Sequence, residues 1–216
     1  MTLDQIELAC NAAGLAIIGA FHPDTNAGAP ADCETLVLLG PLEPGFWDRI
    51  TTSPEFAQPD PVDHWSTRVI GDIATDLDAT ALFPFGGPPY QPFVSWALAC
   101  GRVWQSPVSL MIHDDAGLFL SFRGALAFAE RLDLPALVGN SPCETCADKP
   151  CLTACPANAL TPESYNVPTC HAWLDEKRGK TCLEGGCLVR RACPVSQSYG
   201  RLAEQSAHHM RHFHKG

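Results

Sequence analysis

The sequence predicts a mixed α/β (α+β) fold in two parts: a sheet domain of residues 1–140 and a small cysteine-rich domain of residues 141–216. Three observations predict it. Apolar residues alternate between helical and strand periods up to about residue 140. Eight of the eleven cysteines follow that point. The net charge changes there as well, from −12 (five Arg, no Lys, 17 acidic residues) to +2 (nine basic, seven acidic residues).

The first predicted elements are a helix and two strands. Apolar residues at helical spacing over residues 3–10 predict a helix, which Gly14 ends. The apolar run 15–19 predicts a strand, and residues 35–39 predict a second, buried strand that stops at Gly40-Pro41.

A longer amphipathic helix is predicted over residues 61–77, with Asp60 as its N-cap. The stretch 83–93 contains four prolines and two glycines, which break both periodicities and predict an aromatic loop. Residues 93–100 then predict a further helix that ends before a glycine.

A β-hairpin is the last element predicted in the N-terminal domain. Residues 108–113 and 117–123 have strand composition and flank the turn 114–116. The C-terminal domain would be marginal in size without metal or disulfide staples, since a core of this size buries little surface.

The cysteines of the C-terminal domain are the candidate metal ligands. They form two runs that each end in Cys-Pro, with one cysteine between the runs: Cys143-x2-Cys146-x4-Cys151-x3-Cys155-Pro156, Cys170, and Cys182-x4-Cys187-x5-Cys193-Pro194. Thiolates are soft ligands for iron-sulfur clusters or zinc, and two 4Fe-4S clusters need eight of them. In the familiar two-cluster spacing, the fourth cysteine of a run serves the other cluster. That pattern assigns Cys143, Cys146, Cys151 and Cys193 to one cluster and Cys155, Cys170, Cys182 and Cys187 to the second.

A zinc-stapled interaction module is the alternative for the same residues, because Cys143-x2-Cys146 could be half of a four-thiolate site. Zinc sites usually use two separated pairs and need no proline after the last ligand, so we favour clusters. Cys10, Cys33 and Cys100 are scattered in apolar surroundings, which is typical of small hydrophobic residues.

Composition excludes several classes of partner. A net charge of −10 argues against nucleic acid, whose binding requires Lys and Arg at the phosphates. The chain opens without a positively charged leader and has no run of about 18 apolar residues, so we expect a cytoplasmic protein with no membrane association. A reducing compartment would also favour metal binding over disulfides.

The stretch Cys143 to Pro194 resembles the ferredoxin-like module of epoxyqueuosine reductase, which carries two 4Fe-4S clusters beside a cobalamin. Gly101-Arg102-Val103-Trp104 precedes it in that family's order. The upstream domain is similar to cobalamin-processing proteins of the CblC type, through Asp60-Pro61-Val62-Asp63 and through Ile112-His113 followed by Gly117 to Gly124. These resemblances imply a flavin-reductase or nitroreductase-like sheet domain that holds a base-off corrinoid.

One departure from the first family matters. Epoxyqueuosine reductases place a catalytic aspartate just before the helix that leads to Gly101, where this chain has Phe85-Gly86-Gly87-Pro88-Pro89. A missing general acid costs roughly a hundredfold or more in rate, so the chain is not predicted to be an epoxyqueuosine reductase. No catalytic residue is assigned.

Four residues are candidates for binding the corrinoid. The resemblance places Arg123 where CblC-type proteins have an arginine that contacts a thiol cosubstrate or the cofactor. Tyr90, Phe85 and Trp104 could wall a flat tetrapyrrole, although ordinary packing would explain them equally well. His113 is expected to be a solvated turn residue.

The sequence therefore predicts an iron-sulfur oxidoreductase that passes electrons from a donor protein through two clusters to a cobalamin-type corrinoid. The alternative is a dicluster ferredoxin that carries electrons for a partner enzyme and binds no small cofactor of its own. The acidic N-terminal domain would suit docking to a basic partner. His208 and His212, one helical turn apart, could bind a metal or belong to a frayed terminus.

Overall fold

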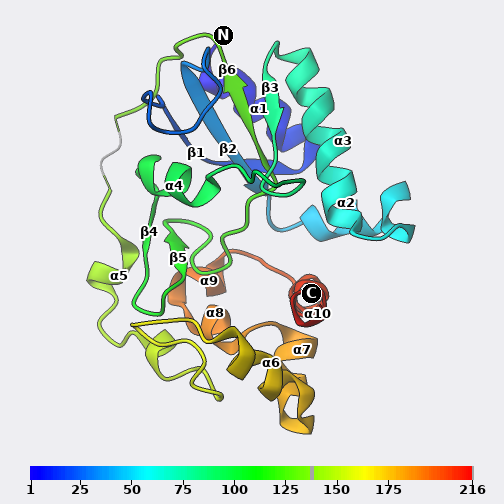
Figure 1. Ribbon diagram of the computed structural model, residues 1–216, viewed down its shortest axis with the longest axis vertical. Coiled ribbons are helices and arrows are strands. Elements are labelled where there is room, and N and C mark those ends of the chain that lie inside the picture. The colour runs from blue at the N-terminus through cyan, green and yellow to red at the C-terminus, as the bar shows by residue number, and fades with distance from the viewer. Residues whose placement is uncertain (137–138, 216) are drawn as a thin grey trace. The chain divides into compact units, whose positions relative to one another are not determined.

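The computed structural model describes residues 1–136 and 139–215, and the chain divides into two compact units (Figure 1). Unit 1 comprises Met1–Arg102 and Ser121–Gly139, and unit 2 comprises Val103–Leu120 and Asn140–Gly216. The chain therefore leaves unit 1 after Arg102, returns to it at Ser121 and leaves it again after Gly139. The segment 103–120, which the sequence placed in the N-terminal domain, packs with the cysteine-rich part.

Unit 1 is built on a four-stranded antiparallel sheet in the order β1-β2-β6-β3. The central strands β2 (Thr35–Pro41) and β6 (Gly124–Phe128) pair with each other, β1 (Leu15–Phe21) pairs with β2, and β3 (Thr80–Leu82) pairs with β6. The predicted mixture of helices and strands is confirmed. Since every strand pair among the described residues of unit 1 is antiparallel, its sheet is of the α+β type.

Helices α1 (Leu3–Ala13) and α3 (Pro61–Asp76) pack on this sheet (Figure 1). Together with the short helix α2 (Phe46–Thr51) they enclose the unit 1 core. Its fully buried members include Ile6, Cys10, Leu15, Val37, Leu39, Phe46, Ile50, Ile70 and Leu126. Helix α4 (Phe93–Ala99) follows the proline-rich loop, and Cys100 after it lies against Gly19 of β1.

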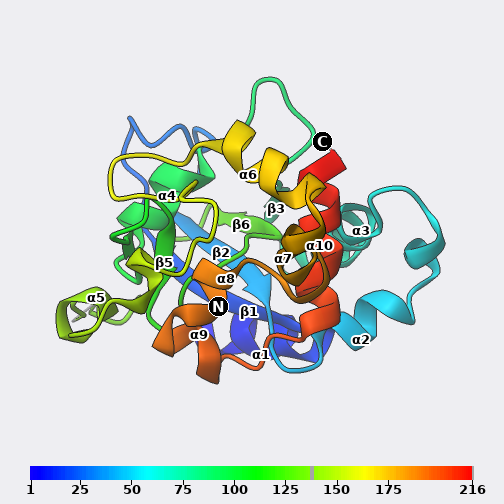
Figure 2. The same ribbon diagram turned by 90° about the horizontal axis from the view of Figure 1, so that it is seen from below.

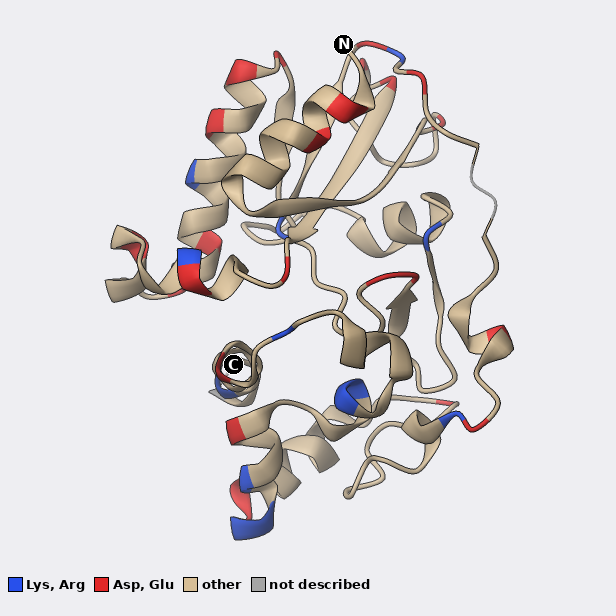
Figure 3. Cartoon of the chain, turned by 180° about the vertical axis from the view of Figure 1, so that it is seen from behind, with Lys and Arg blue, Asp and Glu red and all other residues tan. Residues whose placement is uncertain are grey.

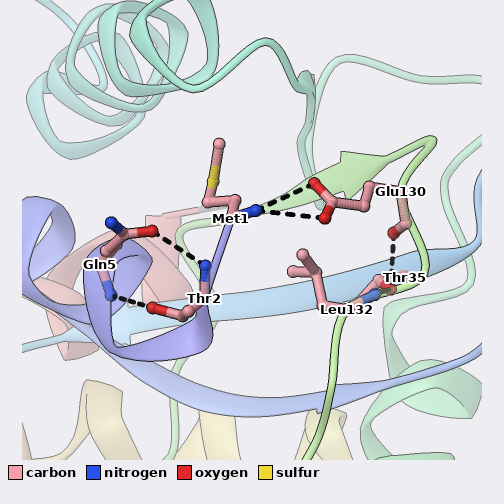
Figure 4. A network of polar contacts seen from close by, with 6 residues as sticks. All are labelled: Met1, Thr2, Gln5, Thr35, Glu130 and Leu132. Carbon is pink, nitrogen blue, oxygen red and sulfur yellow. Dashed lines mark hydrogen bonds and ion pairs between the residues drawn. The ribbon is translucent and has the colours of Figure 1, made fainter.

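Local signals explain why α1 begins and ends where the sequence predicts. Thr2 and Gln5 form a capping box at its start, and Gly14 ends it in the left-handed conformation at φ 86° (Figure 4). The amino group of Met1 lies 3.1 Å from Oε1 of Glu130, and Thr35 Oγ1 donates to the carbonyl of Glu130 at 2.9 Å (Figure 4). These contacts fix the start of α1 beside the chain that leaves β6.

Two details differ from the prediction. Asp60 is the N-cap residue of α3 as predicted, but its backbone is left-handed at φ 47° and its side chain makes no capping hydrogen bond. The predicted hairpin also differs, because β5 (Met111–His113) pairs with β4 (Val103–Gln105) and residues 117–123 contribute an isolated bridge between His113 and Gly117.

The sequence pattern missed the short strands β3 and β4 and the central strand β6. All five residues of β6 are buried between two neighbouring strands, so they show no apolar-polar alternation. The preceding run 117–123 is equally apolar, and periodicity alone does not separate the two.

Unit 2 combines the β4-β5 pair with short helices. These are α5 (Pro142–Thr145), α6 (Val167–Asp175), α7 (Lys180–Gly185), α8 (Leu188–Ala192), α9 (Pro194–Ser198) and α10 (Ala203–Lys215). Helix α10 packs beside α7 (Figures 1 and 2). The unit 2 core contains Val108, Ile112 and Leu118 from the segment 103–120, with Leu160 and Val189 from the cysteine-rich part.

The acidic N-terminal part and the basic C-terminal part of the sequence are also distinct in the structure. Acidic residues are spread along α1 and α3, and most of the Lys and Arg residues lie in unit 2 (Figure 3). Within residues 1–136 and 139–215, no helix combines the length and the apolar character needed to cross a bilayer.

Candidate metal centre

The eight C-terminal cysteines all lie in unit 2, on short helices or the turns beside them. Cys143 lies in α5, Cys170 in α6 and Cys182 in α7, whereas Cys187 and Cys193 immediately precede α8 and α9. The proline that follows Cys193 is the first residue of α9, a position where its missing N–H leaves no hydrogen bond broken. The Cys-Pro step therefore presents the thiol directly at a helix start.

The first group of thiols consists of Cys143, Cys146, Cys151 and Cys193, which we call group one. All four line a single pocket of about 400 Å³. Burial raises the pKa of the Cys143 thiol, and the nearby thiols of Cys193 and Cys146 raise it further. Burial likewise raises the pKa of Cys151, with added effects from Cys143, Cys193 and Cys146.

The second group of thiols consists of Cys155, Cys170, Cys182 and Cys187, which we call group two. Burial raises the pKa of Cys170, and the thiols of Cys187, Cys155 and Cys182 act in the same direction. Burial also raises the pKa of Cys182, followed by the effects of Cys187 and Cys155. The thiols of Cys155 and Cys187 therefore lie close enough to Cys170 and Cys182 to raise the pKa of both.

Each group contains one cysteine that belongs, in the sequence, to the run of the other group. Cys193 belongs to the second run in sequence but lies with group one, and Cys155 belongs to the first run but lies with group two. The division coincides with the crossed assignment described above. The role of these cysteines as ligands stays a prediction.

Across the part of the chain that the structure describes, no three His, Cys, Asp or Glu side chains converge tightly enough to hold one metal ion. Ligands of a single zinc must all reach within about 2.3 Å of it, whereas the four thiolates of a 4Fe-4S cluster bind four separate irons. All eleven cysteines have free thiols.

Hydrogen bonds to sulfur are present in group two. The backbone N–H of Ala159 donates to Cys155 Sγ at 3.2 Å. The side chain of Tyr165 lowers the pKa of Cys170, and the backbone at Leu188 lowers that of Cys182, each against the larger effect of burial. Donors aimed at sulfur favour thiolate over thiol, which is the state a metal requires.

The chain matches no family model, no curated protein and no solved structure in three comparisons. The arrangement of its own residues therefore carries the functional assignment. In that arrangement the segment 103–120 forms one wall of group one, since Ile112 and Leu118 line the pocket with the four cysteines. Arg190 donates a hydrogen bond to the carbonyl of Leu118 and holds the wall in place.

Arg123 is partly buried in unit 1, where Nη1 lies 3.3 Å from Asp63 Oδ1 and Nη2 lies 3.4 Å from Ser121 Oγ. Burial lowers the pKa of Arg123, and Asp63 opposes that effect. Burial raises the pKa of Asp63 despite the nearby guanidinium. The Nε atom of Arg123 is buried without a hydrogen-bond partner among the described residues, so the guanidinium keeps one donor available.

The three aromatic candidates do not come together as one wall within a unit. Tyr90 is 67% exposed, and Phe85 stacks on Phe83 with 5.3 Å between ring centroids in the proline-rich loop. Trp104 belongs to unit 2 and packs against the core that contains Cys151 and Cys193. We find no geometric support in unit 1 for a shared aromatic wall.

Two histidine predictions are also revised. His113 is buried, with an exposed fraction of 2%, and its Nδ1 accepts hydrogen bonds from the N–H groups of Asp115 at 3.1 Å and Ala116 at 3.0 Å. It therefore organises the turn after β5 from the inside. His208 and His212 lie in α10 with ring centroids 4.1 Å apart, and burial, then the neighbouring His212 and Arg211, lower the pKa of His208 to about 4.

Sequence reasoning missed Tyr165, Ser196 and Arg190. None belongs to a recognisable motif. Ser196 and Arg190 both bond to the backbone of Leu118, which is distant in the chain, and Tyr165 affects the pKa of Cys170. The buried thiol of Cys10 agrees with its interpretation as a small apolar residue, since burial, then the charge of Glu7, raises its pKa to about 12.

Proposed function

We propose that the protein is an iron-sulfur electron-transfer protein whose unit 2 holds two 4Fe-4S clusters. The observation that carries this proposal is the exchange of Cys155 and Cys193 between the two thiol groups. Two independent zinc sites gain nothing from such crossing, whereas it is the ligand pattern of two-cluster ferredoxins. Group one and group two would each hold one cluster.

When bound, the clusters would supply one-electron exchange. The residues of unit 2 would hold them, keep water away and set their potentials. Ile112 and Leu118 line the pocket of group one with apolar surface, and Ala159 donates to a sulfur of group two. Burial and hydrogen bonds to sulfur are the means by which proteins tune such potentials.

For the electron acceptor we propose a cobalamin-type corrinoid at unit 1, in a nitroreductase-like domain, on the basis of the family resemblance. Arg123 supports this acceptor, because a partly buried guanidinium whose Nε has no hydrogen-bond partner among the described residues suits an anionic or amide group of a ligand. The exposed Tyr90 favours the second candidate, a dicluster electron carrier without a small cofactor.

Metal analysis of anaerobically purified protein tests the clusters. We expect about eight iron and eight sulfide per chain with visible charge-transfer absorption. Cys155→Ser should remove the cluster that Cys182→Ser removes, and Cys193→Ser the cluster that Cys143→Ser removes, as judged by electron paramagnetic resonance. Cys33→Ser in unit 1 is the matched control and should keep all the iron. Zinc in place of iron, or loss of the same cluster in Cys155→Ser and Cys143→Ser, would contradict the proposal.

Titration with cobalamins tests the acceptor. Clusters reduced by dithionite should change the visible spectrum of added cobalamin, and Arg123→Met should weaken its binding. Arg131→Met is the control, since Arg131 lies on the surface of unit 1 with 63% of its side chain exposed. Intact clusters without any cobalamin response would leave the carrier function as the assignment.

A further inference from the structure

We propose that His171 and His214 form a binding site for a divalent transition-metal ion such as Zn²⁺, separate from the eight cysteines. Both histidines belong to unit 2, His171 to α6 and His214 to the last turn of α10. The inference goes beyond the proposed function and does not depend on it, because no cysteine takes part in this site. The bound ion would join α6 to the C-terminal end of α10, which lies beside it (Figure 2).

Ring packing brings the two histidines together from distant parts of the sequence. The ring of Phe213 makes an edge contact with His171 at 4.7 Å between centroids and stacks on Tyr165 at 6.1 Å. These contacts anchor the end of α10 against α6. His214 follows Phe213, and its ring centroid lies 5.4 Å from that of His171, with 83° between the ring planes.

Asp175 fixes the hydrogen-bonding state of His214. It lies one helical turn after His171 on α6, and its Oδ1 is 3.0 Å from Nε2 of His214. An ionised carboxylate only accepts hydrogen bonds, so Nε2 of His214 carries a proton and donates. In the neutral ring Nδ1 then presents a lone pair. Proteins orient metal-binding histidines by this same pairing of a carboxylate with the second ring nitrogen.

Two buried nitrogens lack hydrogen-bond partners at this point. Among the described residues neither Nε2 of His171 nor Nδ1 of His214 has one, although both atoms are shielded from solvent. Nε2 of His171 also bears a lone pair when its proton is on Nδ1. A buried polar atom without a partner costs free energy, and a cation between the two nitrogens removes that cost for both.

The separation of the rings suits a single ion. A tetrahedral metal about 2.1 Å from each nitrogen places the ring centroids roughly 5 Å apart. Imidazole suits Zn²⁺ and Ni²⁺, whereas Mg²⁺ and Ca²⁺ prefer oxygen ligands. Since no third His, Cys, Asp or Glu converges with the pair among the described residues, water completes the coordination. With 72% of the Asp175 side chain exposed, an aquated ion can reach the site from that side.

The site is distinct from group two although Cys170 and His171 are neighbours. Successive residues of an α-helix point about 100° apart around its axis, so the two side chains leave α6 in different directions. Cys170 lies with the other thiols of group two, whereas His171 faces Phe213 and His214. A metal at the histidines therefore leaves all eight cysteines to their own ligand role.

Zinc titration of the anaerobic, cluster-loaded protein is the direct test. Isothermal titration calorimetry should show one bound Zn²⁺ per chain. His171→Gln and His214→Gln each remove one of the two protein ligands and should abolish this binding. Asp175→Ala should weaken it about 10- to 100-fold, the range for a residue that orients a metal-binding histidine. Equal affinity in the wild type and in His214→Gln would overturn the inference.

Two histidine variants control for binding elsewhere on the surface. His212→Gln changes a histidine of the same helix whose Nδ1 already donates to the carbonyl of His208 at 3.0 Å. His64→Gln changes an exposed histidine of α3 in unit 1. Both variants should bind zinc with wild-type affinity. Loss of the ion in His212→Gln, with retention in His171→Gln, would place it at the other histidine pair and overturn the inference.

X-ray absorption at the zinc edge covers the case in which a variant fails to fold, because it needs only the wild-type protein. One equivalent of zinc on the cluster-loaded protein should have nitrogen or oxygen neighbours at about 2.0–2.1 Å and no sulfur at about 2.3 Å. Sulfur neighbours would place the ion at the cysteines and overturn the inference. A protein that binds no iron would overturn the proposed function alone, and the inference would then be decided by whether His214→Gln binds one zinc fewer than the wild type.

Discussion

The hydroxyl of Ser196 accepts a hydrogen bond from the backbone N–H of Leu118 at a distance of 2.8 Å. Both residues are buried, with exposed fractions of 2% and 1%. Ser196 lies in α9, three residues after Cys193, and Leu118 lies in the segment that unit 2 takes from the middle of the chain. The Ser196 hydroxyl thus satisfies the buried N–H of Leu118, a residue that lines the pocket of group one.

Replacing that hydroxyl should weaken unit 2. Ser196→Ala leaves the N–H of Leu118 without its acceptor, and we expect the free energy of unfolding to fall by about 1–3 kcal/mol. Ser198→Ala is the control, because its exposed hydroxyl bonds only to the carbonyl of Val195 in its own helix, and it should change stability by less than about 0.5 kcal/mol. Urea unfolding and hydrogen exchange of unit 2 amides measure both, and equal effects would contradict the role of Ser196.

A methyl group at Gly117 should have a larger effect. Its φ is 57°, and an added Cβ would lie 2.5 Å from the backbone nitrogen of Ser196. Gly117→Ala should therefore combine backbone strain of about 1 kcal/mol with displacement of α9. Gly86→Ala shares the positive φ and has nothing within 4 Å of the new Cβ, so it isolates the strain. If thermal unfolding shows the same loss in both, the contact with Ser196 is unimportant.

The ion pair of Glu55 and Arg68 should make unit 1 sensitive to acid. Arg68 Nε lies 2.5 Å from Glu55 Oε1, and its hydrogen bond lowers the pKa of Glu55 to about 2. Because the folded pKa lies below the ordinary value of 4.5, the stabilisation is present above about pH 4.5 and is lost as the pH falls toward about 2. Arg68→Met should lower Tm near neutral pH, and its difference from wild type should narrow below about pH 4.5 and nearly close only near pH 2.

The exposed pair of Arg131 and Glu34, with 3.6 Å between Nη1 and Oε2, provides the comparison. Arg131→Met should change Tm little at either pH, as exposed ion pairs contribute little to stability. A constant gap between Arg68→Met and wild type across the acid range would show that Glu55 does not couple stability to pH.

The centre of the unit 1 sheet should tolerate truncation poorly. Leu126 of β6 is fully buried in the core, and Leu126→Ala should cost about 2–5 kcal/mol through lost contacts and a cavity. Leu8, which is 73% exposed on α1, supplies the matched substitution, and Leu8→Ala should change the free energy of unfolding by less than about 0.5 kcal/mol. Chemical denaturation should therefore show a much larger loss in the free energy of unfolding for Leu126→Ala than for Leu8→Ala.

Features set by neighbouring residues were predictable from the sequence. The start and end of α1 depend on Thr2, Gln5 and Gly14, all within or beside the helix. The extent of α3 was predicted from its apolar spacing, although the left-handed backbone of Asp60 was not. Local chemistry therefore predicted the elements better than their details.

Features set by distant partners were not predictable. β6 and the run before it are both apolar, and only pairing with β2 and β3 distinguishes them. Tyr165 acquires its position from Phe213, 48 residues later, which leaves no local trace in the sequence. The eight cysteines were predicted as ligands from their spacing, which is a local feature, whereas the wall supplied by the segment 103–120 required the structure.

The threefold crossing of the chain between its units has a consequence for biosynthesis. When residues 103–120 leave the ribosome, β6 follows almost at once and unit 1 can complete its sheet. Val108, Ile112 and Leu118 must wait until Cys193 has been translated, about 70 residues and several seconds later. During that interval these three apolar side chains lack the C-terminal residues that cover them in the folded unit 2.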